Sequence, residues 1–267
     1  MPKTNKRLGF SGREPPESSA ENQLEGWPLQ WGMMEKLTVI VTGAAGGLGK
    51  VIASAFLAAG ANVVINDIND QRIAAVEAEW STSFAGKFIT RNASLVAVSV
   101  ARYGRLDILV NNAGIMDDFS PAGSISKEKW DRVLDVNLNG PYLTTKAAIA
   151  QFEKQEPSGG LIINIGSNAG VHTFHAGAAY TVSKAGLLAL TKNTAAYYGP
   201  KGIYCLALTL GGDMFQRIQA AQTPFASGKT TVPVESIAKY IVFLSDSDIA
   251  PNSNGACIQF NRNWPEA

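Results

Sequence analysis

From residue 37 onward, short apolar runs alternate with longer segments in which apolar residues recur every three or four positions. The short runs are rich in β-branched residues, and several are apolar on both faces, which is typical of a parallel sheet covered on each side. They predict strands at 37–42, 63–67, 87–90, 108–111, 161–165, 203–208 and 256–260. The longer segments predict helices near 47–60, 69–80, 94–103, 127–154, 178–198 and 234–245. This alternation favours a single α/β domain with a doubly wound parallel sheet.

The first 32 residues have a different composition. Only 8 of them are hydrophobic, and 4 of the chain's 12 prolines fall there. Such a segment buries too little apolar surface to offset the entropy lost on ordering. We therefore expect residues 1–32 to form a disordered extension and residues 33–267 to form the folded domain. The chain has no run of 18 apolar residues, so no membrane span is predicted.

Charge and cysteine content narrow the classes of function. A formal net charge of +1 leaves no excess of Lys and Arg for binding nucleic acid. Cys205 and Cys257 are too few for a disulfide framework, so a reducing cytoplasmic location is expected. His172 and His175 have no Cys or acidic companions at ligand spacing, so no metal site is predicted.

A glycine-rich turn follows the first predicted strand. Residues 42–49 read Thr-Gly-Ala-Ala-Gly-Gly-Leu-Gly, and a predicted helix comes next. Glycines permit unusual backbone angles there and let a pyrophosphate approach the unpaired N–H groups of the helix N-terminus. Gly43, Gly47, Leu48 and Gly49 are therefore candidate cofactor-binding residues, with a purely structural turn as the alternative.

Asp67 ends the second predicted strand, 18 residues after Gly49. A carboxylate in this place accepts hydrogen bonds from the ribose hydroxyls of adenosine. It would also repel the additional phosphate of NADP, and neither Gly46 nor Ile68 supplies a basic side chain to bind that phosphate. NAD is therefore predicted in preference to NADP, although Asp67 could instead be an ordinary turn residue.

The candidate reacting groups lie at the start of a predicted helix. Tyr180 and Lys184 are four residues apart and share one helix face, so the ammonium can lie beside the phenol. A cation beside the phenol favours phenolate, so Tyr180 could take the proton of an alcohol as hydride leaves, or return it in reduction. Ser167, 13 residues upstream at a strand end, would hold the substrate oxygen. The alternative is an exposed Lys one turn from a half-buried Tyr.

Two further motifs, Asn111-Asn112-Ala113-Gly114 and Asp135-Val136-Asn137, occur upstream in a specific order and spacing. With them, the chain from about residue 37 to residue 264 resembles the short-chain dehydrogenase/reductase family. The resemblance implies a Rossmann-type fold with a parallel sheet of about seven strands. It also implies assembly as a homodimer or homotetramer.

The resemblance assigns roles to single residues. It implies that Tyr180 is the acid/base, that Lys184 lowers the pKa of Tyr180 and binds the nicotinamide ribose, and that Ser167 stabilises the substrate oxygen. It implies that Asn137 holds a water linking Lys184 to solvent. Asn112 would lie on the adenosine side of the cofactor.

Three segments depart from the family's pattern. Only 19 residues separate Asn92 from Asn111, so the helix between them is expected to be about two turns short. Leu210-Gly211 stands in place of the familiar Pro-Gly, and the stretch from there to Pro233, expected to form the substrate lid, is also short. Loop drift, a mis-spliced or partial coding sequence and genuine specialisation are all open explanations.

The leading prediction is an oxidoreductase that transfers hydride between NAD(H) and a small to medium secondary alcohol or ketone. Neither nucleic acid nor a membrane is expected as a partner. The alternative is a dinucleotide-binding regulatory or scaffold protein with little catalysis, because the helix and the lid are short. The joint presence of Asn137, Ser167, Tyr180 and Lys184 favours the enzyme, since a regulator need not keep all of them.

Overall fold

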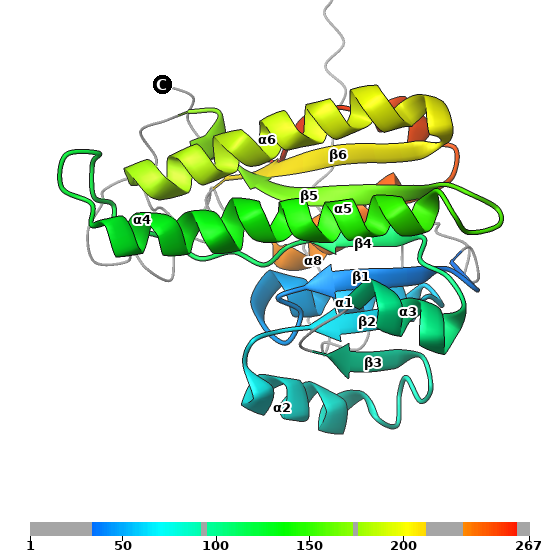
Figure 1. The fold of residues 1–267 in the computed structure, drawn as a ribbon. Coiled ribbons are helices and arrows are strands. Elements are labelled where there is room, and N and C mark those ends of the chain that lie inside the picture. Colours follow the sequence, from blue (N-terminus) through cyan, green and yellow to red (C-terminus); the bar gives the residue numbers. More distant parts are fainter. Residues whose placement is uncertain (1–33, 92–94, 173–175, 212–231, 261–267) are drawn as a thin grey trace, which may run out of the picture. The chain divides into compact units, whose positions relative to one another are not determined.

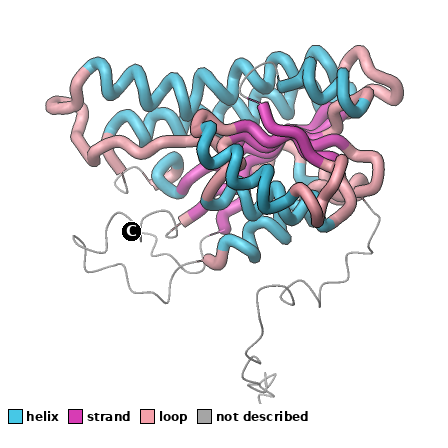
Figure 2. The backbone as a smooth tube through the Cα atoms, turned by 90° about the horizontal axis from the view of Figure 1, so that it is seen from below, coloured by secondary structure: helices cyan, strands magenta, loops and turns pink. Residues whose placement is uncertain are grey.

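The computed structural model describes residues 34–91, 95–172, 176–211 and 232–260. The expected extension, residues 1–32, lies outside these ranges, as do residues 212–231 of the expected lid and His175. Within the described residues, one sheet carries helices on both of its faces (Figures 1 and 2).

Seven parallel strands form this sheet in the spatial order β3-β2-β1-β4-β5-β6-β7 (Figure 1). The strands are β1 (Thr38–Thr42), β2 (Asn62–Asn66), β3 (Phe88–Arg91), β4 (Ile108–Asn111), β5 (Gly160–Ser167), β6 (Ile203–Leu210) and β7 (Cys257–Phe260). The order reverses between β1 and β4, because the chain builds β1 to β3 toward one edge before it crosses back. Ligands of doubly wound sheets bind at such a reversal, outside the carboxyl ends of the strands. The predicted Rossmann-type fold is confirmed.

The helices form two layers, one on each face of the sheet (Figure 2). The α-helices are α1 (Gly47–Ala58), α2 (Asp70–Trp80), α3 (Leu95–Tyr103), α4 (Lys127–Leu134), α5 (Gly140–Phe152), α6 (Ala178–Tyr198) and α8 (Val234–Leu244). Short helical turns are η1 (Asp135–Asn139), η2 (Asn168–Gly170), η3 (Gly199–Lys201) and η4 (Pro251–Ser253). Helix α1 packs against α8, whereas α3 packs against α5. The 9 residues of α3 agree with the expected short helix.

The continuous helix predicted at 127–154 is wrong in its middle. Helix α4 ends at Leu134, the π-helical turn η1 spans Asp135–Asn139, and α5 begins at Gly140. A π turn inserts one residue into the helical repeat, and a shift of one position is too small to recognise in the apolar pattern of a single sequence. Such turns occur frequently at functional sites, and Asn137 lies in this one.

Strands β5 and β6 are longer than predicted. The predicted ends were residues 165 and 208, but the strands continue to Ser167 and Leu210, which are register partners. Ser167 is therefore held by the sheet itself rather than by a loop. A group on a sheet strand has a better defined position than one on a free loop.

A buried hydrogen-bond network joins the centre of the sheet to its helices. Asn111 of β4 donates to Oδ1 of Asn164 on β5 at 2.8 Å and to Oγ1 of Thr145 on α5 at 3.3 Å. Asn164 donates in turn to Oγ1 of Thr191 on α6 at 2.9 Å. Because these polar groups satisfy one another inside an apolar core, they fix how α5 and α6 lie on the sheet.

Candidate active site

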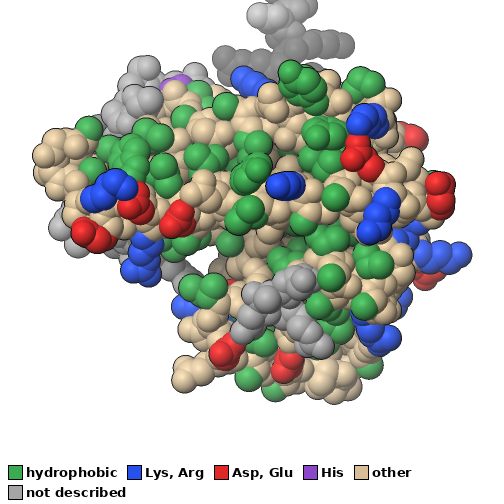
Figure 3. Space-filling view, viewed as in Figure 1, with side chains coloured by type: hydrophobic (Ala, Val, Ile, Leu, Met, Phe, Trp, Pro, Cys, Tyr) green, Lys and Arg blue, Asp and Glu red, His purple; other side chains and the backbone are tan. Residues whose placement is uncertain are grey.

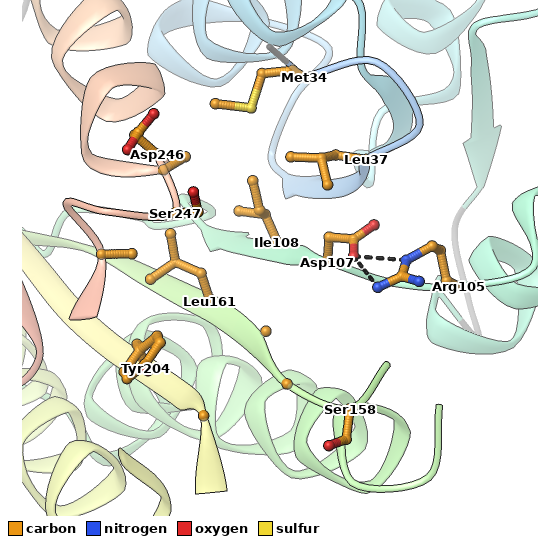
Figure 4. Close-up of a pocket in the computed structure, with 15 residues that line it drawn as sticks. Met34, Leu37, Arg105, Asp107, Ile108, Ser158, Leu161, Tyr204, Asp246 and Ser247 are labelled. Atoms are coloured by element: carbon orange, nitrogen blue, oxygen red, sulfur yellow. Dashed lines mark hydrogen bonds and ion pairs between the residues drawn. The ribbon is translucent and has the colours of Figure 1, made fainter. Parts of the chain in front are cut away.

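Two cavities of comparable size lie at opposite ends of the strands. One, of about 410 Å³, lies at the amino ends of the strands (Figure 4). Two of its charged groups are already paired, because Asp107 binds the Arg105 guanidinium at 2.7 Å and accepts from the backbone N–H of Thr38 at 2.8 Å. The other, of about 560 Å³, lies at the carboxyl ends. Its position, where doubly wound sheets bind ligands, makes it the candidate active site.

Six of the predicted site residues line this second cavity: Gly47, Leu48, Asn112, Ser167, Tyr180 and Lys184. The others, Gly43, Gly49, Asp67 and Asn137, do not line it but support it. Their contacts explain how the cavity is shaped, as the following paragraphs describe.

The glycine-rich turn requires glycine at two positions, for lack of space at Gly49 and for the backbone angle at Gly47. A Cβ on Gly49 would lie 2.2 Å from the carbonyl oxygen of Gly43 and 2.5 Å from Nδ2 of Asn112, so no other residue fits there. Gly47 instead has a left-handed φ of +52°, and a Cβ there would meet nothing within 4 Å. No side chain caps the start of α1 at Gly46. The turn therefore offers uncapped N–H groups beside open space, as a bound phosphate requires.

Asp67 and Asn112 hold the turn in place from either side. Oδ2 of Asp67 accepts from the N–H of Ala45 at 3.1 Å, and its Oδ1 accepts from the N–H of Asn69 at 3.0 Å. Asn112 donates to the carbonyl oxygens of Thr42 at 2.9 Å and Gly43 at 3.3 Å. Each carboxylate oxygen has lone pairs left to accept a further hydroxyl hydrogen. A purely local turn role for Asp67 does not account for its long-range bond to Ala45.

Two side chains beside Asp67 add to the sequence interpretation. Ile68 is 93% exposed, an unusual state for a large apolar side chain next to a cavity-forming turn. Arg72, in the first turn of α2, extends back toward Gly46, where a Cβ would lie 3.5 Å from its Nη1. The sequence prediction considered only Gly46 and Ile68 as places for a basic side chain and missed Arg72. The first turn of the following helix was the signal, because its side chains point back toward the preceding loop.

Ser167, Tyr180 and Lys184 converge from a strand end and one helix face. Tyr180 and Lys184 are 1% and 3% exposed, so the alternative of a half-buried Tyr beside an exposed Lys is excluded. Nζ of Lys184 lies 5.7 Å from the centroid of the Tyr180 ring and donates to the carbonyl oxygen of Ile165 at 2.8 Å. The phenol of Tyr180 shares a hydrogen bond with the side chain of Ser167.

Burial is the largest influence on the pKa values of both Tyr180 and Lys184. It raises the pKa of Tyr180 to about 12, an effect that the hydrogen bond from Ser167 opposes and the negative charge of Asp117 increases. Burial also lowers the pKa of Lys184 to about 8. The lowering of the Tyr180 pKa by Lys184 that the resemblance implies stays a prediction, because it also depends on the positive charge of a bound nicotinamide. At neutral pH the phenol is protonated and available as a proton donor.

Asn137 is fully buried and anchors the loop after β4. Its Oδ1 accepts from the N–H of Ile115 at 2.8 Å, and its Nδ2 donates to the carbonyl oxygen of Ile115 at 2.9 Å and to Oγ of Ser183 at 3.2 Å. A Cβ on Gly114 would lie 3.4 Å from Oδ1 of Asn137 and 3.5 Å from Nζ of Lys184. Asn137 thus lies near Lys184, with both of its amide hydrogens bonded and one lone pair of Oδ1 left to accept from a further donor.

Asp117 is a further residue that the sequence interpretation missed. Its carboxylate accepts from the N–H of Tyr180 at 2.9 Å and from the N–H of Gly177 at 3.1 Å. Along the chain, Gly177 lies 60 residues and Tyr180 lies 63 residues from Asp117. No local motif signals such a contact.

The described part of the chain contains no group of three or more His, Cys, Asp or Glu side chains able to hold a metal ion. None of the described helices is both long and apolar enough to cross a bilayer.

Comparison with known proteins gives consistent matches. A family model described as short chain dehydrogenase matches residues 37–222. The chain is 40% identical over 253 residues to "Short chain dehydrogenase/reductase dpfgG" of Gibberella zeae, a match that covers 85% of this chain and 93% of the relative. It is 33% identical over 247 residues to "3beta-hydroxysteroid dehydrogenase 2" of Eggerthella lenta, covering 85% and 94%. The crystal structure of gox2181 has the same fold, with a TM-score of 0.76 at 24% identity over 86% of this chain and 96% of that one.

Proposed function

The chain belongs to the short-chain dehydrogenase/reductase family, and from that premise we propose that it is an NAD(H)-dependent oxidoreductase for a secondary alcohol or its ketone. The observation that carries the proposal is the convergence of Ser167, Tyr180 and Lys184 on one cavity at the carboxyl ends of the strands. When bound, the nicotinamide supplies or accepts the hydride.

The side chains would divide the acid–base work. Ser167 donates a hydrogen bond to the substrate oxygen and aligns it with Tyr180. In reduction, the protonated phenol of Tyr180 gives its proton to the oxygen as the carbonyl becomes an alcohol. In oxidation, Tyr180 accepts that proton, and the ammonium of Lys184 stabilises the phenolate that must form first. Asn137 would support this relay by holding a water beside Lys184.

The cofactor would lie along the glycine-rich turn. Gly47 and Leu48 would offer uncapped N–H groups to the pyrophosphate, and Gly43 and Gly49 would keep the turn in the shape that allows this. Asp67 accepts from the ribose hydroxyls, which favours NAD over NADP. Tyr180 and Lys184 contact the nicotinamide end.

The cavity favours an apolar substrate. Its lining includes Leu48, Val51, Ile165, Leu210 and Ile237, and the relative from Eggerthella lenta is named for a secondary alcohol on a steroid ring. We therefore include cyclic secondary alcohols among the candidate substrates, with small and medium acyclic ones as the comparison.

Self-association is part of the proposal. Helices α5 and α6 carry exposed apolar side chains, with Leu143 at 60% and Tyr197 at 72% exposed, and hydrophobic side chains are visible on this side of the molecule (Figure 3). A homodimer or homotetramer would cover them. We also propose a cytoplasmic location, because Cys205 and Cys257 are free thiols.

Substitution of Tyr180 by Phe tests the function. We expect Tyr180→Phe to lower kcat at least about 100-fold, the lower range for loss of a general acid–base group, while the affinity for NADH stays within about threefold. NADH absorbance measures turnover over a panel of cyclic and acyclic ketones and alcohols that includes a 3β-hydroxysteroid, and NADH fluorescence measures binding.

Tyr204→Phe is the matched control, because Tyr204 lies on β6 beside the cavity at the amino ends of the strands, away from the candidate active site. It should leave both measurements unchanged. Binding of NADH without turnover of any substrate in the wild-type protein would contradict the enzyme and support a dinucleotide-binding regulator.

A further inference from the structure

Helix α6, which carries Tyr180 in its first turn, has no capping side chain of its own. Its N-cap residue is Gly177, which has none to offer, and its first turn contains no acidic residue. The first N–H groups of a helix have no partner within the helix and need an acceptor from elsewhere. In a buried position this need is strict, because an unpaired N–H there is costly.

Asp117 supplies that acceptor from the loop after β4. It is only 8% exposed, and each of its oxygens takes part: Oδ1 accepts from Gly177 at 3.1 Å and from Phe119 at 3.2 Å, and Oδ2 accepts from Tyr180 at 2.9 Å. The carboxylate therefore holds its own loop and the start of α6 together. One of its bonds is to the backbone N–H of Tyr180 itself.

Gly177 is the residue that admits this carboxylate. A Cβ at that position would lie 2.4 Å from Oδ2 and 2.7 Å from Oδ1 of Asp117, distances that side chains do not adopt. Its φ of −72° is accessible to any residue, so backbone conformation does not explain the glycine. The requirement at position 177 is space for Asp117.

The charge of Asp117 acts on the same residue as its hydrogen bonds do. Two charged groups lie near Tyr180, the Asp117 carboxylate and the Lys184 ammonium, and the Ser167 hydroxyl is its neutral hydrogen-bond partner. The carboxylate makes loss of the phenol proton harder, whereas the ammonium makes it easier. An anion at a helix N-terminus is also favoured by the helix dipole.

We propose that Asp117 is a positioning residue of the active site, whose carboxylate fixes the first turn of α6, and with it Tyr180, against the loop after β4. The inference rests on the role proposed for Tyr180. Asp117 acts through Tyr180 and is not proposed to touch the substrate.

Asp117→Asn is the informative substitution, because it keeps the shape and one acceptor oxygen but removes the charge. We expect kcat to fall about 10- to 100-fold with KM changed by less than about threefold, since small displacements of a reacting group have effects of that size. With the negative charge gone, the pKa of Tyr180 falls, so the limb of the pH–rate profile that reports the phenol moves to lower pH.

A second measurement does not depend on activity. Ultraviolet titration of phenolate absorbance, taken as the difference between each protein and its Tyr180→Phe derivative, follows the ionisation of Tyr180 alone. We expect the midpoint for Asp117→Asn to lie at lower pH than that for the wild type. Asp117→Glu, which restores the charge, should return the midpoint toward the wild-type value.

Asp118→Asn is the control, because Asp118 is the neighbouring carboxylate in the same loop but pairs with Lys129 at the surface. It should change neither kcat nor the titration. An unchanged kcat and midpoint in Asp117→Asn would overturn the positioning role. If Tyr180→Phe proves fully active, the proposed function fails, while the titration still decides whether Asp117 controls Tyr180.

Discussion

At the residue scale, two side chains of opposite charge lie beside the glycine-rich turn. The Asp67 carboxylate binds the turn at Ala45, and the Arg72 guanidinium lies beside Gly46, the next residue. No ion pair among the described residues joins Arg72 to an acid. A ribose hydroxyl needs the acceptor that Asp67 offers, whereas the phosphate of NADP needs a cation. The balance between these two side chains should therefore set the choice of cofactor.

Removing each charge tests this balance. We expect Asp67→Asn to raise the affinity for NADPH relative to NADH at least about tenfold, because one like-charge repulsion of a few kcal/mol is removed. Adding Arg72→Gln should abolish the gain, since the phosphate then has no cation beside it. Fluorescence titration with both reduced dinucleotides gives the two affinities.

The control is Lys50→Gln, because Lys50 is a cation on the neighbouring helix α1 that already pairs with Glu79 at 2.6 Å. It should leave the ratio of affinities unchanged. A ratio unaltered by Asp67→Asn would mean that Asp67 supports the turn but does not distinguish the cofactors.

At the element scale, most strands and helices could be predicted because each carries its own pattern. Buried parallel strands are continuous apolar runs, and residues such as Val39, Ile40 and Val41 of β1 are completely buried. The failures lie where an element depends on a neighbour. Gly166 and Ser167 are poor strand formers, yet β5 includes them because β6 pairs with them across the sheet.

The residues of the candidate site also fall into those that local sequence spacing predicts and those that depend on the complete fold. Sequence spacing was sufficient for Tyr180 and Lys184, since residues four positions apart on a helix share a face. It was not sufficient for Asp117, because the hydrogen bond to Tyr180 joins the loop after β4 to the start of α6, and only the complete fold brings these two segments together.

The polar network between β4, β5, α5 and α6 gives a prediction about stability. Asn164→Leu keeps a similar volume but removes the groups that bind Asn111 and Thr191, leaving buried polar atoms with fewer partners. We expect a loss of about 1–3 kcal/mol in the free energy of unfolding, measured by urea denaturation.

Asn252→Leu serves as the matched change at the surface, because Asn252 makes one exposed hydrogen bond, to the carbonyl oxygen of Asp248. Its effect should stay within about 0.5 kcal/mol. Equal losses in the two variants would show that the buried network contributes nothing beyond a surface hydrogen bond.

At the scale of the whole molecule, the proposed self-association rests on the exposed apolar side chains of α5 and α6. Tyr142 and Leu143 on α5 and Val182 and Tyr197 on α6 are all between 43% and 72% exposed. We expect Leu143→Glu to shift the protein to a smaller species, because a charge placed in an apolar interface is desolvated without a partner. Sedimentation velocity over a range of concentrations measures the change.

The corresponding control is Ala75→Glu, an exposed position on α2. Its sedimentation should match that of the wild type. A monomeric wild-type protein at micromolar concentration would contradict the association proposed here.

The length of α6 has a practical consequence. This single 21-residue helix turns Tyr180 and Lys184 inward and Val182 and Tyr197 outward, and a helix moves largely as one body. Under the proposed association and activity, specific activity should therefore vary with dilution as subunits separate. Because the proposed association surface includes the outer side of α6, this side would be a poor place for tags or added charges, although much of it faces solvent.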